Sequence, residues 1–125
     1  MKFSCQGLEL ADAVLKVVKA AAVRTTNPIL ECVKMVAEDD KLTLTCTDLE
    51  LTITKSINAD VKVTGMAVIP AKFFADFVSK ISGEQLEFNL RGKTLDVVYG
   101  DNSAFFQCQD ATEFPEPKTL EQPEY

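Results

Sequence analysis

The sequence predicts an α+β domain of two β-α-β-β-β halves related by a pseudo-twofold, with the helices on one face of the sheets. Helical periodicity occurs twice, and each time it follows a short β-prone segment. After each helical segment come stretches in which apolar and polar residues alternate, separated by turn residues. The 125 residues, 46% of them apolar and 26% charged, are enough to bury one core without disulfides or a structural metal.

The first half opens with a predicted strand over residues 2–6 and continues with a helix. The stripe of this helix that is expected to face the core consists of Leu8, Ala11, Leu15, Val18 and Ala22, joined by Val14 and Ala21. The opposite face is polar, and Asp12 is placed to pair with Lys16 at i, i+4. The helix is expected to end before Pro28, which forces Asn27 toward extended geometry.

Strand character returns in the rest of the first half. Residues 29–37 are rich in apolar side chains, and the acidic residues 38–40 form a turn. Residues 41–47 alternate cleanly, which predicts a half-buried strand. The alternation resumes over residues 49–57, and a further extended stretch runs over residues 61–65.

The second half repeats this order, and the repeat is the main organisational feature of the chain. Residues 66–69 predict a strand, Pro70 is placed at a helix start, and Gly83 ends the helix. Lys72 and Asp76 are again spaced for an ion pair. The apolar stripe of this helix consists of Phe74, Phe77, Val78 and Ile81. The strands predicted after it cover residues 85–90, 94–99 and 103–108.

The predicted domain covers residues 1–115. Residues 116–125 are expected to be a linker or tail, because apolar residues become scarce there and prolines recur. A linker with nothing after it indicates one domain of a longer protein. No run of residues is apolar and long enough to span a membrane, and charged residues interrupt the N-terminal stretch where a signal peptide needs an apolar core.

The residue types argue against catalysis and against a metal or cofactor site. The chain has no His, which removes Ser-His and Cys-His pairs, an imidazole base and the usual zinc sites. Its five glycines are dispersed, so no phosphate-binding loop is predicted. The cysteines are expected to be small buried hydrophobes of a cytoplasmic protein, and one of them as a nucleophile is the enzymatic alternative. They are Cys5, Cys32, Cys46 and Cys108.

The placement of the basic residues matters, because a net charge of −6 argues against a protein coated in positive charge. If a pseudo-twofold relates the halves, the two helices lie side by side and present one mildly basic surface. Such a surface follows phosphates without reading bases. The alternative is that these are ordinary solvated helix faces. The cations on or just after the helices are Lys16, Lys19, Arg24, Lys72 and Lys80.

Five phenylalanines gather in the second half, more than the core sides of one helix and one strand need. They are Phe73, Phe74, Phe77, Phe105 and Phe106. Phe73 falls off the apolar stripe, and Phe105 and Phe106 must point to opposite sides of their strand. Part of this aromatic surface is therefore predicted to face a partner, with core packing as the alternative for any one ring.

Five motifs occur in register over nearly the whole chain. They are Met1-Lys2-Phe3, Arg24-Thr25-Thr26-Asn27-Pro28-Ile29-Leu30, Lys41-Leu42-Thr43-Leu44-Thr45 followed by Thr47-Asp48-Leu49-Glu50, Pro70-Ala71-Lys72, and Glu113-Phe114-Pro115. In these motifs the chain resembles the N-terminal domain of the bacterial DNA polymerase III beta subunit family, the replicative sliding clamps. The resemblance implies a DNA-clamp fold, with three such domains per subunit and two subunits closing head to tail into a ring around double-stranded DNA.

The resemblance also implies site residues. Arg24 and Lys72 are the positions implied for contact with the DNA backbone, and Lys16, Lys19 and Lys80 are weaker inferences from helix face alone. For the interface with a second subunit it implies Phe73, Phe77 and Ile81 from the helix and Phe105 and Gln107 from the strand. The hairpin at residues 100–104 departs in length from the family pattern, so the choice between Phe105 and Phe106 stays open.

The resemblance further implies a non-catalytic subunit that gives processivity to DNA polymerase III, whose complex as a whole carries polymerase and exonuclease activity. The polymerase and the clamp loader are expected to bind through domains that this chain lacks, and no cofactor is expected. By itself the chain is expected to bind DNA weakly and to close no ring. The alternative is a stand-alone adaptor module that binds a protein through the Phe73 and Phe105 surface and has no role on DNA.

Overall fold

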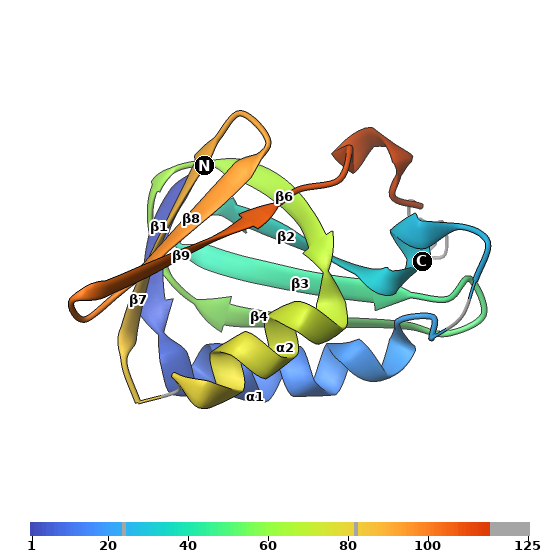
Figure 1. The fold of residues 1–125 in the computed structure, drawn as a ribbon, viewed down its shortest axis with the longest axis horizontal. Coiled ribbons are helices and arrows are strands. Elements are labelled where there is room, and N and C mark those ends of the chain that lie inside the picture. The colour runs from blue at the N-terminus through green and yellow to red at the C-terminus, as the bar shows by residue number, and fades with distance from the viewer. Residues whose placement is uncertain (24, 82, 116–125) are drawn as a thin grey trace.

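The computed structural model describes residues 1–23, 25–81 and 83–115 (Figure 1). Over these residues the chain forms nine strands, two α-helices and three 3₁₀ turns. The strands are β1 Lys2–Gln6, β2 Cys32–Glu38, β3 Lys41–Thr47, β4 Thr52–Asn58, β5 Asp60–Val63, β6 Gly65–Pro70, β7 Gln85–Arg91, β8 Thr94–Tyr99 and β9 Asn102–Gln107. The helices are α1 Gly7–Val17 and α2 Ala71–Lys80, and the 3₁₀ turns are η1 Val18–Ala20, η2 Pro28–Glu31 and η3 Ala111–Glu113. The predicted tail at residues 116–125 lies outside the described residues.

The strands form two antiparallel sheets, and each sheet takes strands from both halves of the chain. Sheet A has the order β5-β1-β7-β8-β9, and sheet B has the order β4-β3-β2-β6. β1 therefore pairs with β7 of the second half, while β6 pairs with β2 of the first. This exchange is consistent with a pseudo-twofold in which β1 to β4 correspond to β6 to β9. The predicted fold class is confirmed, and β5 is an additional strand at the edge of sheet A.

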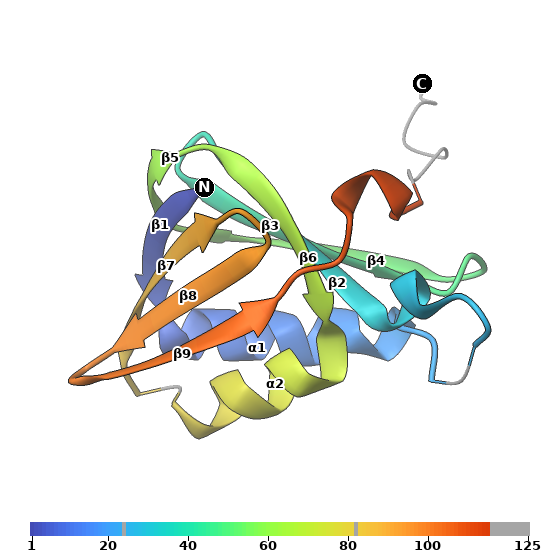
Figure 2. The same cartoon turned by 45° about the horizontal axis from the view of Figure 1, so that its top comes forward.

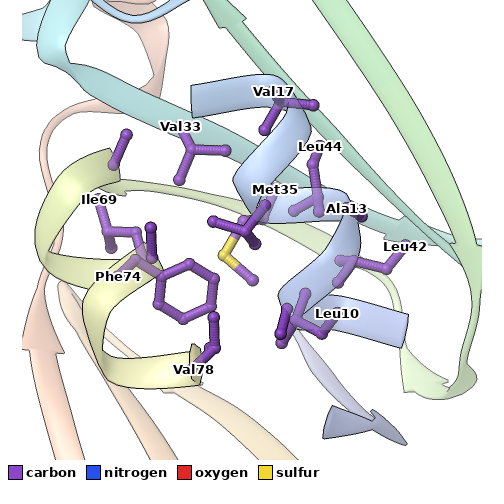
Figure 3. Close-up of a cluster of buried hydrophobic side chains, with 14 of the residues drawn as sticks. Leu10, Ala13, Val17, Val33, Met35, Leu42, Leu44, Ile69, Phe74 and Val78 are labelled. Carbon is purple, nitrogen blue, oxygen red and sulfur yellow. The ribbon is translucent and has the colours of Figure 1, made fainter. Parts of the chain in front are cut away.

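Both helices lie side by side on the same face of the two sheets (Figures 1 and 2). The main core fills the space between helices and sheets, and it fully buries Leu10 and Val14 of α1 and Phe74 and Val78 of α2. Figure 3 shows Met35 of β2 lying between the side chains of the two helices. Burying an apolar side chain of this size contributes about 1.5–3 kcal/mol, so this shared core holds the helix pair in place.

The predicted core-facing stripe of α1 is confirmed at Ala11 and Val14 and wrong at Leu8 and Leu15. Leu8 is 70% exposed and Leu15 is 49% exposed. The residues that α1 buries are Gly7, Leu10, Ala11, Ala13, Val14 and Val17. Apolar residues cover more than half of the circumference of α1, so periodicity alone permits two overlapping stripes. Close packing selects the stripe with the small residues, because these let α1 approach α2 and sheet B.

The start of β2 also differs from the prediction. Ile29 and Leu30 lie in η2, because Pro28 opens that turn with a fixed φ and has no N–H to donate to a strand ladder. Their side chains join a small second apolar cluster with Cys32, Val68 and Phe114. This cluster lies on the side of sheet B away from the helices, since side chains alternate along β2.

The strand predicted after Asp48 begins later than expected, at Thr52. The Asp48 carboxylate accepts hydrogen bonds from the backbone N–H groups of Glu50, at 3.0 Å, and Leu51, at 2.7 Å. Leu49 adopts the left-handed region with φ of 82°, which a leucine rarely occupies. Residues 48–51 therefore form a tight turn, and the alternating strand predicted over residues 49–57 is wrong at its start, where the Leu49 and Leu51 side chains are both exposed.

Candidate functional site

Four of the five cations singled out in the sequence lie on or just after the helices, and all four are exposed. They are Lys16 on α1, Lys19 in η1, and Lys72 and Lys80 on α2. The fifth, Arg24, lies outside the described residues. Since α1 and α2 lie side by side (Figure 2), these exposed lysines come from one layer of the molecule.

Lys16 and Lys72 differ in their electrostatic surroundings. The Nζ atom of Lys16 lies 3.1 Å from the Asp12 carboxylate, so the predicted pair at i, i+4 is confirmed. The corresponding pair between Lys72 and Asp76 does not form within the described part of the chain. An exposed ion pair is weak, but it offsets part of the local field. Lys72 therefore presents its charge to solvent without a neighbouring carboxylate bound to it.

A mainly apolar groove of about 590 Å³ runs between α2 and β9. Its lining consists of Pro70, Phe73, Asp76, Phe77, Lys80, Ala104, Phe105, Phe106 and Gln107. Four of the residues predicted for a subunit interface are therefore brought together here. The fifth, Ile81, does not line the groove; it is half-buried and packs against the main core.

Aromatic rings form the floor and the rim of this groove. The ring centroid of Phe77 lies 5.2 Å from Phe106 and 5.4 Å from Tyr99, both in edge-to-face contact. Phe106 also meets Phe74 at 5.5 Å, which joins the groove floor to the core. By contrast, Phe73 is 73% exposed and Phe105 is 65% exposed. Along β9, Phe106 thus packs inward, and Phe105 faces solvent.

The chain matches the model of one protein family over residues 1–119, described as the N-terminal domain of the DNA polymerase III beta subunit. The chain belongs to this family. It is 30% identical over 131 residues to the beta sliding clamp of Bacillus subtilis, a match that covers 98% of this chain and 35% of that protein. It is 32% identical over 130 residues to the beta sliding clamp of Synechocystis, covering 97% of this chain and 33% of that protein.

Solved clamp structures have the fold of this beta-subunit domain. The crystal structure of the DNA polymerase sliding clamp of Bacillus subtilis matches with a TM-score of 0.88 and 30% identity, covering 93% of this chain and 33% of that one. The clamp of Caulobacter crescentus matches with a TM-score of 0.88 and 27% identity, covering 93% of this chain and 32% of that one. The chain thus spans about a third of the length of these relatives.

Sequence reasoning about this beta-subunit domain missed part of the groove. It did not include Asp76 or Lys80 among the groove residues, and it left Phe106 undecided. One signal was available: Phe73, Asp76, Phe77 and Lys80 stand at i, i+3, i+4 and i+7, which is the spacing of one helix face. That face lines the groove in the structure.

The thiols of the domain are poor nucleophiles. Burial raises the pKa of Cys5 to about 12, of Cys32 to about 11 and of Cys46 to about 12, and it also raises the pKa of the half-buried Cys108. Because the thiolate is the reactive form, these side chains are almost wholly protonated near neutral pH. Burial thus argues against the cysteine nucleophile of the enzymatic alternative. No helix in the described ranges is long and apolar enough to cross a membrane.

Proposed function

We propose that this chain is the first domain of a sliding clamp subunit, which encircles duplex DNA when paired with a second subunit and gives processivity to DNA polymerase III. The observation that carries the proposal is the agreement of the whole described fold with clamp domains, at a TM-score of 0.88. Tethering by a ring is topological, so the proposed role is non-catalytic.

Contact with DNA is assigned to the helix side of the domain. Lys72 and Arg24 are the principal positions, and Lys16, Lys19 and Lys80 are supporting ones. Exposed ammonium groups on flexible stems can meet phosphates in many arrangements, and they read no base edges. Such contacts form and break as the duplex moves, which suits sliding. The net charge of −6 leaves little attraction elsewhere on the surface.

The groove between α2 and β9 is assigned to the subunit interface, where it would meet the third domain of the second clamp subunit, head to tail. Support comes from its apolar lining and from the exposure of Phe73 and Phe105 among the described residues. Phe77 and Gln107 complete the contact surface. Ile81 packs against the main core and thereby supports the end of α2 beside the groove.

The remaining partners are assigned to other parts of the longer subunit. Polymerase III and the clamp loader are assigned to the second and third domains of that subunit. The compartment is assigned as the cytoplasm, where DNA replication takes place in bacteria. The free cysteines Cys5, Cys32, Cys46 and Cys108 fit a reducing compartment.

The first experiment is an immunoblot of source-cell extract with an antibody raised against this chain. A clamp subunit of three such domains gives a band about three times the size of this chain. A band at the size of this chain would contradict the clamp proposal and favour the adaptor, since one domain cannot enclose DNA.

The second experiment reverses charge at the principal positions in the subunit that carries this domain. Arg24→Glu with Lys72→Glu is expected to abolish retention on circular DNA, and to lower the slope of log K against log salt by about 1 for each phosphate that the variant no longer neutralises. Lys41→Glu, at an exposed position of β3 in sheet B, is the matched control. Unchanged DNA retention by the double variant, with protein binding through the groove intact, would favour the adaptor.

A further inference from the structure

The segment between α1 and β2 is anchored in two separate cores. Ala20 and Ala21, at its start, are buried in the main core, whereas Ala22 packs against the second apolar cluster. The buried members of this second cluster are Ile29, Leu30, Cys32, Val68 and Phe114. The segment therefore passes from the helix side of sheet B to the opposite face. Arg24, one of the two principal cations proposed for DNA contact, stands in the sequence between these anchored ends.

A backbone hydrogen bond closes the neck of the loop that carries Arg24. The N–H of Ala22 donates to the carbonyl oxygen of Leu30 at 2.9 Å. The N–H of Leu30 donates in turn to the carbonyl oxygen of Asn27 at 3.0 Å, and the N–H of Asn27 donates to Thr25 Oγ1 at 3.1 Å. The neck, formed by Ala22 and Leu30, thus lies on the second cluster and fixes where the loop begins and where it returns.

The largest side chain of the second cluster, Phe114, comes from the other end of the domain. It is 3% exposed, and Lys34 Nζ lies 5.9 Å from the centroid of its ring. Figures 1 and 2 show η3, in red, at the same end of sheet B as η2, in blue. Because Phe114 shares one small cluster with Ile29 and Leu30, its ring supplies a large part of the apolar surface on which the neck rests.

Residues 109–114 form a strap over β6 that carries Phe114. The N–H of Gln109 donates to the carbonyl oxygen of Val68 at 2.8 Å. The Asp110 carboxylate accepts hydrogen bonds from the N–H of Thr112 at 3.0 Å and from its hydroxyl group at 2.8 Å, which caps η3. These bonds place the Phe114 ring independently of the loop, so the ring supports the loop from outside it.

We propose that Phe114 is a positioning residue for DNA contact: its ring holds the neck of the loop, and the held neck presents Arg24 to the phosphates of the duplex. The inference rests on the proposed function, which assigns Arg24 to the DNA backbone. A charged side chain on an ordered loop forms its contact at a lower entropic cost than one on a loop that must first be ordered. Removal of the ring therefore weakens the contact, although Phe114 lies on the face of sheet B away from the helices.

Hydrogen exchange of the subunit that carries this domain tests the structural step without DNA. Phe114→Ala is expected to speed exchange at the amides of Ala22 and Leu30 by about tenfold or more, because the neck then opens more often. The amide of Val14, inside α1 and the main core, is expected to keep its wild-type rate. Unchanged exchange at Ala22 and Leu30 would overturn the proposal.

Binding of the dimeric subunit to a short duplex at several salt concentrations tests the functional step. Arg24→Ala is expected to reduce the magnitude of the slope of log K against log salt by about 1, and Phe114→Ala by part of that amount. The double variant is expected to show no larger reduction than Arg24→Ala alone, whereas the effects of Phe114→Ala and Lys72→Ala are expected to add. Additive effects of Phe114→Ala and Arg24→Ala would mean that the ring does not act through Arg24, and the proposal would be wrong.

Two control variants separate this positioning role from a general loss of stability. Leu90→Ala shortens a half-buried side chain of β7 that packs against the main core, and it is expected to leave the salt slope and the exchange of the loop amides unchanged. Phe114→Leu keeps an apolar side chain in the second cluster and is expected to restore most of the wild-type behaviour. If Phe114→Leu were as impaired as Phe114→Ala, apolar support of the neck would not be the cause.

A milder variant keeps the proposal testable if circular dichroism shows that Phe114→Ala does not fold. Asp110→Ala removes only the cap of η3, and it is expected to speed exchange at Ala22 and Leu30 by a smaller factor. No change in that exchange would overturn the proposal. A normal slope in Phe114→Ala beside a reduced slope in Arg24→Ala would overturn this inference alone, whereas an unchanged slope in Arg24→Ala would also contradict the proposed role of Arg24 on DNA.

Discussion

The two halves of the domain share one topology, but they differ at the seam, the boundary between the helix and the edge strand of the same half. In the first half the helix and the strand pack directly together, and in the second a groove separates them. α1 packs directly against β4, whereas a groove of about 590 Å³ lies between α2 and β9. The seventh residue of each helix is Ala13 in α1 and Phe77 in α2. A methyl group lets α1 approach its sheet, while the Phe77 ring stands between α2 and sheet A.

Two further matched positions differ in the same direction. The third residue is Glu9 in α1 and Phe73 in α2. On the edge strands, Ser56 of β4 corresponds to Phe105 of β9. In each half, the residue that follows this position pairs with the second residue of the preceding strand, which is β3 in the first half and β8 in the second. The repeated backbone thus sets where the seams lie. Side-chain volume and polarity at three matched positions decide whether a seam is finished surface or an open groove.

The largest expected effects come from a matched pair in the shared core. Leu10 and Phe74 are the fourth residues of α1 and α2, and both are fully buried. Leu10→Ala is expected to lower the free energy of unfolding by about 2–5 kcal/mol, and Phe74→Ala by about 3–5 kcal/mol. Because the halves exchange strands, each variant should unfold in urea in one transition by both fluorescence and circular dichroism. Separate transitions for the two halves would contradict the shared core.

Exchanging the seventh residues tests the seam itself. Ala13→Phe forces a ring into a closed seam and is expected to cost about 1–3 kcal/mol of stability. Phe77→Ala removes two edge-to-face contacts at a half-buried position, and its expected cost is about 1–2 kcal/mol. Urea unfolding of both variants measures the difference. A larger loss for Phe77→Ala than for Ala13→Phe would show that the second seam is the more tightly packed one.

The outer hairpins are expected to differ in pH dependence. In the first half, N–H groups of Leu51 and Glu50 donate to Asp48 and lower the pKa of its carboxyl. The second-half hairpin turns at Gly100, with φ of 59° and no carboxylate needed. A lowered native pKa stabilises the fold above the ordinary carboxyl pKa of about 4, and this stability is lost as pH falls through the native pKa.

Asp48→Asn keeps an acceptor oxygen in the turn but removes the titration. The melting temperature of the variant is expected to fall less at acid pH than that of the wild type, and the variant is expected to remain folded near neutral pH. Melting temperatures between about pH 2 and pH 6 measure this difference. Gly100, at the turn of the second hairpin, has no titratable side chain. Parallel curves of melting temperature against pH for the wild type and the variant would mean that the Asp48 carboxyl does not contribute to the pH dependence of stability.

The smallest expected effect on stability is at the groove rim. Phe73→Glu gives α2 the residue that α1 has at the matched position. Since Phe73 is 73% exposed, the free energy of unfolding should change by no more than about 0.5 kcal/mol. Association through the groove should weaken at the same time. A large loss of stability would show that Phe73 belongs to the fold of the domain and not to a contact surface.

Much of the fold could be predicted because its signals are local. The alternation over residues 41–47, the prolines at 28 and 70 and the repeated order of segments each act through neighbouring residues. The buried stripe of α1 could not be predicted in this way. Leu8 and Leu10 are equally apolar, and only the approach of α2 and sheet B leaves Leu8 in solvent.

The same distinction, between local sequence signals and contacts that form only in the folded domain, applies to the candidate site. The sequence by itself determined which residues are aromatic or basic, that Lys72 lies on a helix, and that Phe105 and Phe106 face opposite ways along one strand. The tertiary structure alone decided that Phe106 faces the core, that Asp76 and Lys80 flank a groove, and that β9 lies at an edge of sheet A. The physical reason is that these facts depend on contacts between elements distant in the chain, which form only when the two halves exchange strands.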